Sequence, residues 1–173
     1  MEPKFINFKV ENYDAVSIYD YNPFIRKLVY QFKGCFDYEL YEVFLNMYYR
    51  ELKVWFSDYY VIPIPSYIKD DEERGFNHVI ETFKCLGLKT LNILTKTEKH
   101  KQAISTVNER HEIYKSLALK NRPNLKNKKV LIVDDIYTTG STMKSAINLI
   151  EKLNPKQIKV LVIAKTKPKQ MEK

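Results

Sequence analysis

The chain has 173 residues, of which 45% are hydrophobic and 13% aromatic, so it can build a single domain with a buried core. Its 29 Lys and Arg residues exceed its 21 Asp and Glu residues by 29 − 21 = 8, a charge that suits anionic ligands or nucleic acid as well as a solvated lysine surface. The only two cysteines, Cys35 and Cys85, lack the spacing of a zinc cage or a disulfide framework, which predicts reduced thiols.

The amino-terminal residues have no basic-then-apolar leader pattern, and no apolar stretch reaches the roughly 18 residues that a membrane span requires. We therefore expect a cytoplasmic protein without membrane insertion.

Helices are predicted for the first third of the chain. Apolar residues recur at three- and four-residue steps within residues 23–53, with a break near 33–37, which indicates two amphipathic helices. The resulting division is a helical amino-terminal region or hood at 1–56, the core of the fold at 57–166 and a basic tail at 167–173, within a single domain.

A β-rich run at residues 59–64, bounded by Pro63 and Pro65, predicts a strand. The polar residues 66–77 predict a loop, and helical spacing then continues up to Gly87, a suitable residue for a helix end.

Residues 90–94 predict another strand. Residues 95–102 are charged and aperiodic, which indicates a mobile loop, and Thr106 with Glu109 has the spacing of a capping box at a helix start.

The last third of the chain predicts a βαβ unit. Residues 129–133 are apolar and β-branched, as in a strand buried on both faces, an apolar stripe covers 143–153, and 158–164 repeat the buried-strand pattern. Because such a crossover joins parallel strands, we predict an α/β fold with a central, mainly parallel sheet flanked by helices.

Asp134 and Asp135 stand between this predicted strand and its helix, followed by hydroxyl residues around Gly140. Ligands of open parallel sheets bind beyond the carboxyl ends of the strands, and a helix amino terminus with a glycine can approach an anion closely. The alternative is that these residues merely cap the helix, but two adjacent carboxylates repel one another unless a cation or a polyol ligand is present. The pattern therefore predicts a site for a phosphorylated sugar.

The segment 130–142, VLIVDDIYTTGST, resembles the 5-phosphoribosyl-1-pyrophosphate (PRPP) signature of the type I phosphoribosyltransferases. The resemblance implies that Asp134 and Asp135 hold the ribose 2′- and 3′-hydroxyls and that Mg²⁺ accompanies PRPP without direct protein ligands. It implies a 5′-phosphate loop formed by Thr138, Thr139, Gly140, Ser141 and Thr142.

Other motifs resemble one branch, the ComF-type competence proteins. These motifs are VIPIPS at 61–66, RGFN at 74–77, and the stretch 96–110 before the signature. The resemblance implies a role in natural transformation, with single-stranded DNA and the competence machinery as partners. Many members begin with a four-cysteine zinc ribbon, and because this chain lacks such cysteines, no zinc is implied.

The predicted strand end supplies two further candidates, Pro65 and Ser66, which the resemblance places in a pyrophosphate-binding turn. A simple strand-ending turn is the alternative reading of both residues. Arg74 could clamp pyrophosphate as a third catalytic candidate beside the two aspartates, because guanidinium pairs bidentately with phosphate. The alternative is a surface ion pair with Asp70, Asp71, Glu72 or Glu73.

The charged loop supplies Lys96, Lys99, Lys101 and Gln102, which could cover the leaving pyrophosphate or form a solvated charge run. His78, His100 and His111 share no metal-ligand spacing and are interpreted as surface histidines.

Two functions follow from these patterns. The first is a PRPP-binding protein of DNA uptake, and the second is an active nucleobase phosphoribosyltransferase of purine or pyrimidine salvage. The acceptor base and the oligomeric state are left open.

Overall fold

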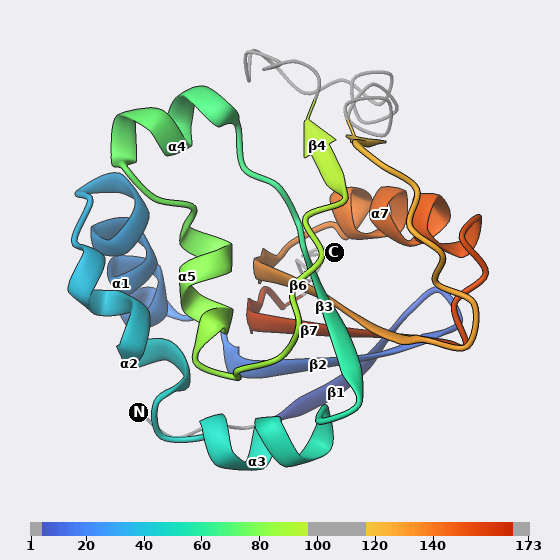
Figure 1. Ribbon diagram of the computed structural model, residues 1–173. Coiled ribbons are helices and arrows are strands. Elements are labelled where there is room, and N and C mark those ends of the chain that lie inside the picture. Colours follow the sequence, from blue (N-terminus) through green and yellow to red (C-terminus); the bar gives the residue numbers. More distant parts are fainter. Residues whose placement is uncertain (1–4, 97–116, 168–173) are drawn as a thin grey trace, which may run out of the picture.

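A five-stranded sheet runs through the computed structural model, which describes residues 5–96 and 117–167 (Figure 1). The strand order is β1-β2-β7-β6-β3; β1 is antiparallel to β2, and all other neighbours are parallel. The predicted α/β class with a mainly parallel central sheet is therefore confirmed. The strands are β1 (Ile6–Val10), β2 (Tyr13–Asp20), β3 (Tyr59–Pro63), β6 (Lys129–Tyr137) and β7 (Gln157–Lys165).

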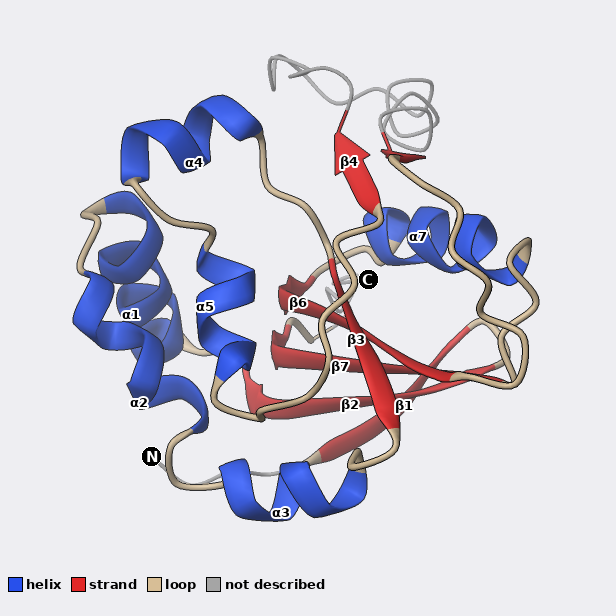
Figure 2. Ribbon diagram, viewed as in Figure 1, coloured by secondary structure: helices blue, strands red, loops and turns tan. Residues whose placement is uncertain are grey.

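Helices cover both faces of the sheet. In Figure 2, α1, α2 and α5 gather beside one side of the sheet, and α7 lies on the other. A second, two-stranded antiparallel sheet pairs β4 with β5 near α7. These elements are α1 (Pro23–Gly34), η1 (Tyr38–Leu40), α2 (Tyr41–Leu45), α3 (Tyr49–Trp55), α4 (Ile68–Arg74), α5 (His78–Lys84), α7 (Ser141–Glu151), β4 (Leu94–Lys96) and β5 (Leu117–Leu119).

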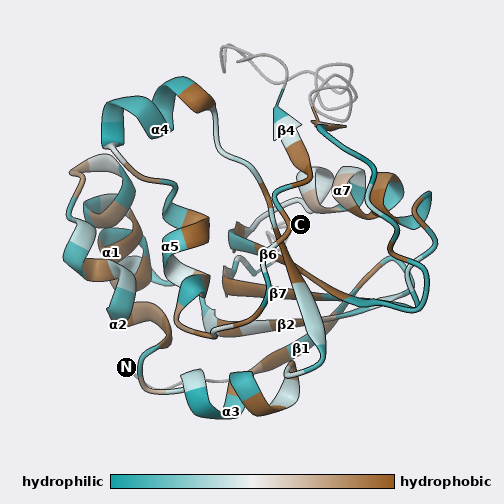
Figure 3. Ribbon diagram, in the orientation of Figure 1, coloured by the Kyte–Doolittle hydropathy of each residue, from teal (hydrophilic) through white to brown (hydrophobic). Residues whose placement is uncertain are grey.

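The alternation of side chains along β6 divides the core into two layers. Leu131 and Val133 pack with residues of α1, α2 and α5, whereas Val130 and Ile132 pack with α7. All four side chains are fully buried, and the central strands are mostly brown in Figure 3. The predicted strand-helix-strand unit is thus confirmed as β6-α7-β7.

The predicted helical amino-terminal region 1–56 begins instead with two strands, because residues 6–20 form β1 and β2. Strand β2 pairs with β7, from Asp14 opposite Lys159 to Asp20 opposite Lys165. That pairing joins residues far apart in sequence, so no local pattern reveals it.

Two further segments differ from the prediction. Residues 66–77, expected to be a loop, contain α4, which has no buried residue and therefore no apolar stripe to signal a helix. Within the expected strand 90–94, Thr90 makes only an isolated bridge to Val61, and β4 begins at Leu94. The helix expected at Thr106 lies outside the described residues.

In the part of the chain that the structure describes, no helix combines the length and the apolar character that crossing a bilayer demands.

Candidate functional site

The two aspartates lie at the carboxyl ends of the parallel strands, where the sheet becomes narrower. Strand β3 pairs with β6 as far as Pro63 opposite Val133, and the backbone N–H of Ile64 donates to the Val133 carbonyl at 2.9 Å. Beyond that point β6 continues beside β7 alone. Asp134 and Asp135 therefore belong to β6 itself, and they lie past the end of β3, which leaves one side of their strand uncovered by the sheet.

A cavity of about 610 Å³ opens at this edge. Both aspartates line it, together with the three residues that follow β3 and with residues of α1, the α4–α5 region and the start of α7. Its basic lining residues are Arg26, Lys33, Arg74 and Lys96. Opposite charges thus face one space, as a phosphorylated sugar with a bound cation would require.

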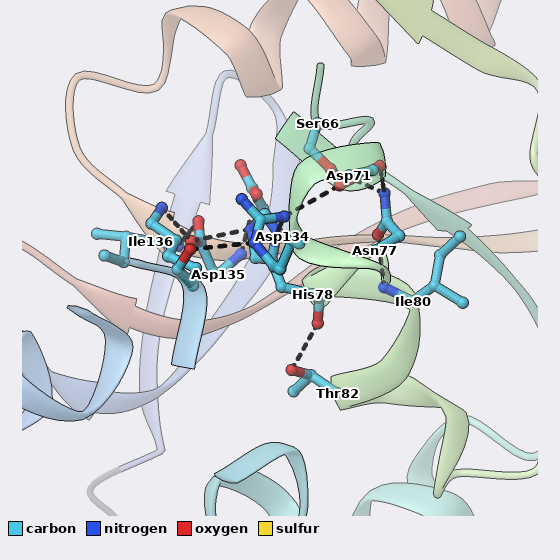
Figure 4. Close-up of polar contacts among 11 residues, drawn as sticks. Ser66, Asp71, Asn77, His78, Ile80, Thr82, Asp134, Asp135 and Ile136 are labelled. Carbon is cyan, nitrogen blue, oxygen red and sulfur yellow. Dashed lines mark hydrogen bonds and ion pairs between the residues drawn. The ribbon is translucent and has the colours of Figure 1, made fainter. Parts of the chain in front are cut away.

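Asp135 is buried, at 8% exposure, and both of its carboxylate oxygens make contacts within the protein. Its Oδ2 accepts from Lys33 Nζ at 2.7 Å and lies 3.3 Å from His78 Nε2, while Oδ1 accepts from the Ile136 N–H at 2.6 Å (Figure 4). Burial alone would raise the pKa of Asp135. The hydrogen bond from His78 and the positive charge of Lys33 outweigh burial and hold that pKa below its usual range.

Asp134 has the opposite electrostatics. Burial and the adjacent Asp135 carboxylate raise the pKa of Asp134 well above its ordinary value, against weaker attraction from Lys96 and Lys33. Its Oδ1 accepts from the Asp135 N–H at 2.9 Å, and the described residues provide no hydrogen-bond donor to Oδ2. An additional cation or hydroxyl ligand would therefore stabilise the ionised form of Asp134.

Arg74 is fixed from three directions. Its Nε donates to the Lys33 carbonyl at 3.0 Å, and its Nη1 lies 3.0 Å from Asp71 Oδ1 and 3.2 Å from His78 Nδ1. The guanidinium therefore joins α1, α4 and α5 around the cavity. The Arg74 side chain is only 8% exposed, so the pair with Asp71 is mostly buried.

Asn77 organises the turn between α4 and α5. Its Oδ1 accepts from the Ile80 N–H at 2.9 Å and caps α5, while its Nδ2 donates to Ser66 Oγ at 2.8 Å and to Asp71 Oδ2 at 2.7 Å. Because Ser66 directly follows the β3 exit, the RGFN motif ties the cavity wall to that turn. Gly75 supports the same turn with φ at +82°, a conformation that side chains rarely adopt.

The predicted phosphate loop connects β6 to α7. Gly140 has φ at +79°, a conformation that other residues rarely adopt, and a Cβ at this position would also force the Tyr137 ring to move. Thr139 Oγ1 lies 3.1 Å from Ser141 Oγ at the start of α7. Thr142 lines the cavity, which places the amino terminus of α7 at its wall.

The structure brings together most of the predicted site residues that it describes. Pro65, Ser66, Arg74, Lys96 and both aspartates line the one cavity with Thr142, whereas Thr138 and Thr139 are exposed. Lys96 Nζ also lies 5.0 Å from the Tyr67 ring centroid, and burial lowers its pKa. Lys99, Lys101 and Gln102 lie outside the described residues.

Lys33 and His78 are site residues that sequence reasoning missed. His78 was interpreted as a surface histidine, and this was wrong: it is 7% exposed and contacts Asp135 and Arg74. Its position directly after RGFN was the available signal, whereas no pattern marks Lys33, which lies 102 residues from its partner. His100 and His111 lie outside the described residues.

The donor set at this edge fits a ligand-borne magnesium ion. Among residues 5–96 and 117–167, no cluster of three or more His, Cys, Asp or Glu side chains could hold a metal. Magnesium is commonly bound through one or two carboxylates plus substrate phosphates, and Asp134 can supply such a carboxylate.

Comparison with solved structures gives weak similarity to a hypoxanthine phosphoribosyltransferase from Staphylococcus aureus. The two share 15% identity, with a TM-score of 0.46 over 75% of this chain and 74% of that one.

Comparison with characterised sequences gives two bacterial relatives named competence protein ComFC. The chain is 28% identical to that of Streptococcus pneumoniae over 149 residues, which cover 86% of this chain and 67% of the relative. It is 28% identical to that of Bacillus subtilis over 139 residues, which cover 79% of this chain and 58% of the relative. The chain thus spans about three fifths to two thirds of their lengths.

The family model described as the phosphoribosyl transferase domain matches residues 77–173, which include the RGFN asparagine, His78 and the whole acidic signature. The chain therefore belongs to the phosphoribosyl transferase domain family, and within it the chain is similar to the ComF-type competence proteins.

Proposed function

We propose that the protein binds PRPP together with Mg²⁺ in the cavity at the carboxyl edge of the sheet and acts in natural transformation, in the uptake of single-stranded DNA. The observation that carries the first part is the position of Asp134 and Asp135, which face a cavity bordered by the start of α7. The names of the two bacterial relatives support the second part.

Different residues of the cavity bind different parts of PRPP. Asp134 accepts hydrogen bonds from ribose hydroxyls, and the loop ending at Thr142 receives the 5′-phosphate at the helix terminus. Pro65 and Ser66 border the pyrophosphate, and Lys96 offsets its negative charge. Bound magnesium would neutralise part of the diphosphate charge.

A thermal-shift titration with PRPP and Mg²⁺ tests the binding. At a ligand concentration of about 100 times Kd, binding adds about 2.7 kcal/mol of stability, which for a chain of this size raises Tm by roughly 5–10 °C. Asp134→Asn should abolish most of that increase. Asp58→Asn is the matched control, because Asp58 is an exposed aspartate at the opposite end of β3. An equal shift in all three proteins would refute the assignment of the site.

The second function is nucleobase transfer in purine or pyrimidine salvage. In that reaction the bond from C1 of the ribose to the pyrophosphate oxygen breaks, and a bond from C1 to a ring nitrogen of the base forms. Space for a base is present: a neighbouring cavity of about 490 Å³ shares Tyr21, Arg26 and Tyr30 with the main one. Aromatic and guanidinium groups can stack on a planar base.

Pyrophosphate release distinguishes the two functions. Incubation with PRPP, Mg²⁺ and a panel of purine and pyrimidine bases should give base-dependent release if the protein is a transferase. If PRPP binds but no base causes the release of pyrophosphate, the result supports the ligand-binding function and contradicts the salvage function.

The DNA role is supported by a basic surface at the amino-terminal ends of the strands, opposite the cavity. The segment 126–129 carries three lysines and no acid. It lies against the turn before β7, because Lys126 forms a bridge with Pro155 and the Lys156 N–H donates to the Lys128 carbonyl at 2.8 Å. The large apolar side chains recorded as exposed lie within residues 24–68, so this surface suits a phosphate backbone better than a lipid layer.

Salt-dependent binding of a fluorescent single-stranded oligonucleotide tests this surface. The logarithm of the affinity should fall with the logarithm of salt concentration by about 0.7 per phosphate contact. Lys126→Gln with Lys128→Gln should lower that slope by about 1.4, whereas the control pair Lys9→Gln with Lys27→Gln should leave it unchanged. A flat salt response of the unmodified protein would contradict DNA binding.

A further inference from the structure

Arg74 and His78 form an ordered chain of polar contacts that ends on the site carboxylate Asp135. Arg74 Nη1 lies 3.2 Å from His78 Nδ1, and His78 Nε2 lies 3.3 Å from Asp135 Oδ2. Figure 4 shows His78 between the α4–α5 network and the acidic end of β6. The imidazole therefore bridges two charged groups of opposite sign through its two nitrogens.

The chemistry of the guanidinium decides which nitrogen of His78 carries the proton. Arginine can only donate, so Nδ1 must be the acceptor and must be unprotonated. The ring proton then resides on Nε2, from which it is donated to Asp135. If both ring nitrogens were protonated, the Nδ1–H would point at the guanidinium, and two cations would be in contact.

The guanidinium itself is not free to turn away. Asp71 accepts from the same Nη1 at 3.0 Å, and the Lys33 carbonyl accepts from Nε at 3.0 Å. The two N–H groups of Nη1 thus serve Asp71 and His78, and both contacts are mostly buried. The imidazole is further fixed by Phe32, whose ring lies edge-on with centroids 6.4 Å apart.

The acceptor positions of the two site carboxylates are used unequally. Asp135 receives Lys33 and His78 on Oδ2 and the Ile136 N–H on Oδ1. Asp134 receives only the Asp135 N–H, on Oδ1, from the described residues. A carboxylate held at both oxygens keeps its orientation, whereas one with an unused oxygen can accept a ligand hydroxyl without losing a contact.

We propose that Arg74 and His78 act as a positioning relay, in which Arg74 fixes the Nε2–H tautomer of His78 and His78 fixes Asp135, so that Asp134 offers its Oδ2 to the ribose hydroxyls. His78 is thus a positioning residue: it lines the cavity, and it acts on the ligand through Asp135. The consequence for the ligand rests on the proposed function, namely that the ribose binds at these acids.

Two amide substitutions separate the two contacts of His78. In His78→Gln the terminal amide nitrogen occupies the position of Nε2 and can still donate to Asp135. In His78→Asn the shorter amide reaches the position of Nδ1, so it can contact Arg74 but leaves Asp135 without its donor. Both variants are neutral and polar, so they form a matched pair for folding and for PRPP affinity.

Calorimetric titration with PRPP and Mg²⁺ measures the affinity of both variants. We expect the affinity of His78→Gln to stay within about 3-fold of that of the unmodified protein. The affinity of His78→Asn should fall by about 10-fold or more, which corresponds to the loss of one hydrogen bond to a charged group. Equal losses in both variants, or no loss in either, would overturn the relay.

The tautomer can be measured without any ligand. In ¹⁵N-correlated spectra of the full chain near pH 7, the His78 signals should show a protonated Nε2 and an unprotonated Nδ1. Arg74→Met should remove this exclusive tautomer, because Nδ1 then loses its donor. Protonation at Nδ1 in the unmodified protein would overturn the relay, whereas absence of PRPP binding with the expected tautomer would overturn only the proposed ligand.

Discussion

Neutralising the two adjacent aspartates one at a time should change stability in opposite directions. Asp135→Asn removes an acceptor for Lys33 and His78, and this carboxylate is 12% exposed. Breaking a buried ion pair costs about 3–5 kcal/mol, and because the Lys33 side chain is 39% exposed we reduce the expected loss to about 2–4 kcal/mol. For a chain of this size, the corresponding fall in Tm is roughly 5–15 °C.

Asp134→Asn should instead stabilise the protein in the absence of ligand. The raised pKa of Asp134 means that its ionised form is less favourable in the folded than in the unfolded chain, through burial and the neighbouring Asp135 charge. Asparagine keeps an oxygen for the Asp135 N–H but carries no charge. We therefore expect Asp134→Asn to be more stable than the unmodified protein at pH 7.

The pH dependence gives an independent check. Wild-type Asp134 becomes protonated as the pH falls towards its ordinary pKa near about 4, so the advantage of Asp134→Asn should shrink between neutral pH and about pH 4. The pKa of Asp135 is lowered in the folded chain, so its contribution is present above about pH 4 and is lost only in stronger acid. The deficit of Asp135→Asn should therefore persist to about pH 4.

Urea unfolding at pH 7, 6, 5 and 4, followed by circular dichroism, measures all three proteins under the same conditions. The reasoning fails if Asp134→Asn is destabilised as much as Asp135→Asn, because the two carboxylates would then have equivalent surroundings.

Two further substitutions test the turns around the cavity. Gly140→Ala should lower stability by about 1–3 kcal/mol and weaken PRPP binding, because φ is positive there and the Tyr137 ring would have to move to admit a Cβ. Wild-type values in thermal and ligand titrations would contradict this. Asn77→Ala should lower stability by about 1–2 kcal/mol, because it removes the cap on the Ile80 N–H. Asn77→Asp keeps that cap but places a second carboxylate beside Asp71, so its loss of stability should be larger. Chemical unfolding of the two Asn77 variants in parallel decides their order.

Local patterns sufficed to predict the unit that carries the acids. The buried run that became β6, the apolar stripe of α7 and the second buried run of β7 each have their own periodicity, and Gly140 marks the turn between the first two. The strands β1 and β2 were missed although they form a local hairpin across Glu11 and Asn12, and only the pairing of β2 with β7, more than a hundred residues away, has no local sign.

The candidate site was predictable only where a motif is continuous in sequence. The acids and the phosphate loop form one continuous segment, and the RGFN motif forms another, so both were found. The contacts of Lys33 and His78 with Asp135 join three segments of the chain; Lys33 stands in no recognisable pattern, and the only sign for His78 is its position directly after RGFN. A polar side chain on a helix gives no sign of whether it meets solvent or a buried carboxylate.

Two identical residues in a row suggest equivalent roles, but a strand makes their surroundings different. Successive side chains of β6 point to opposite faces, so Asp135 follows Leu131 and Val133 towards α1 and α5, while Asp134 follows Val130 and Ile132 towards the face of α7 and β4. The first face supplies a lysine and a histidine that contact Asp135, whereas the second supplies Asp134 with only a more distant lysine. Mutual repulsion therefore favours ionisation of Asp135 and leaves Asp134 as the carboxylate that a bound ligand can stabilise most.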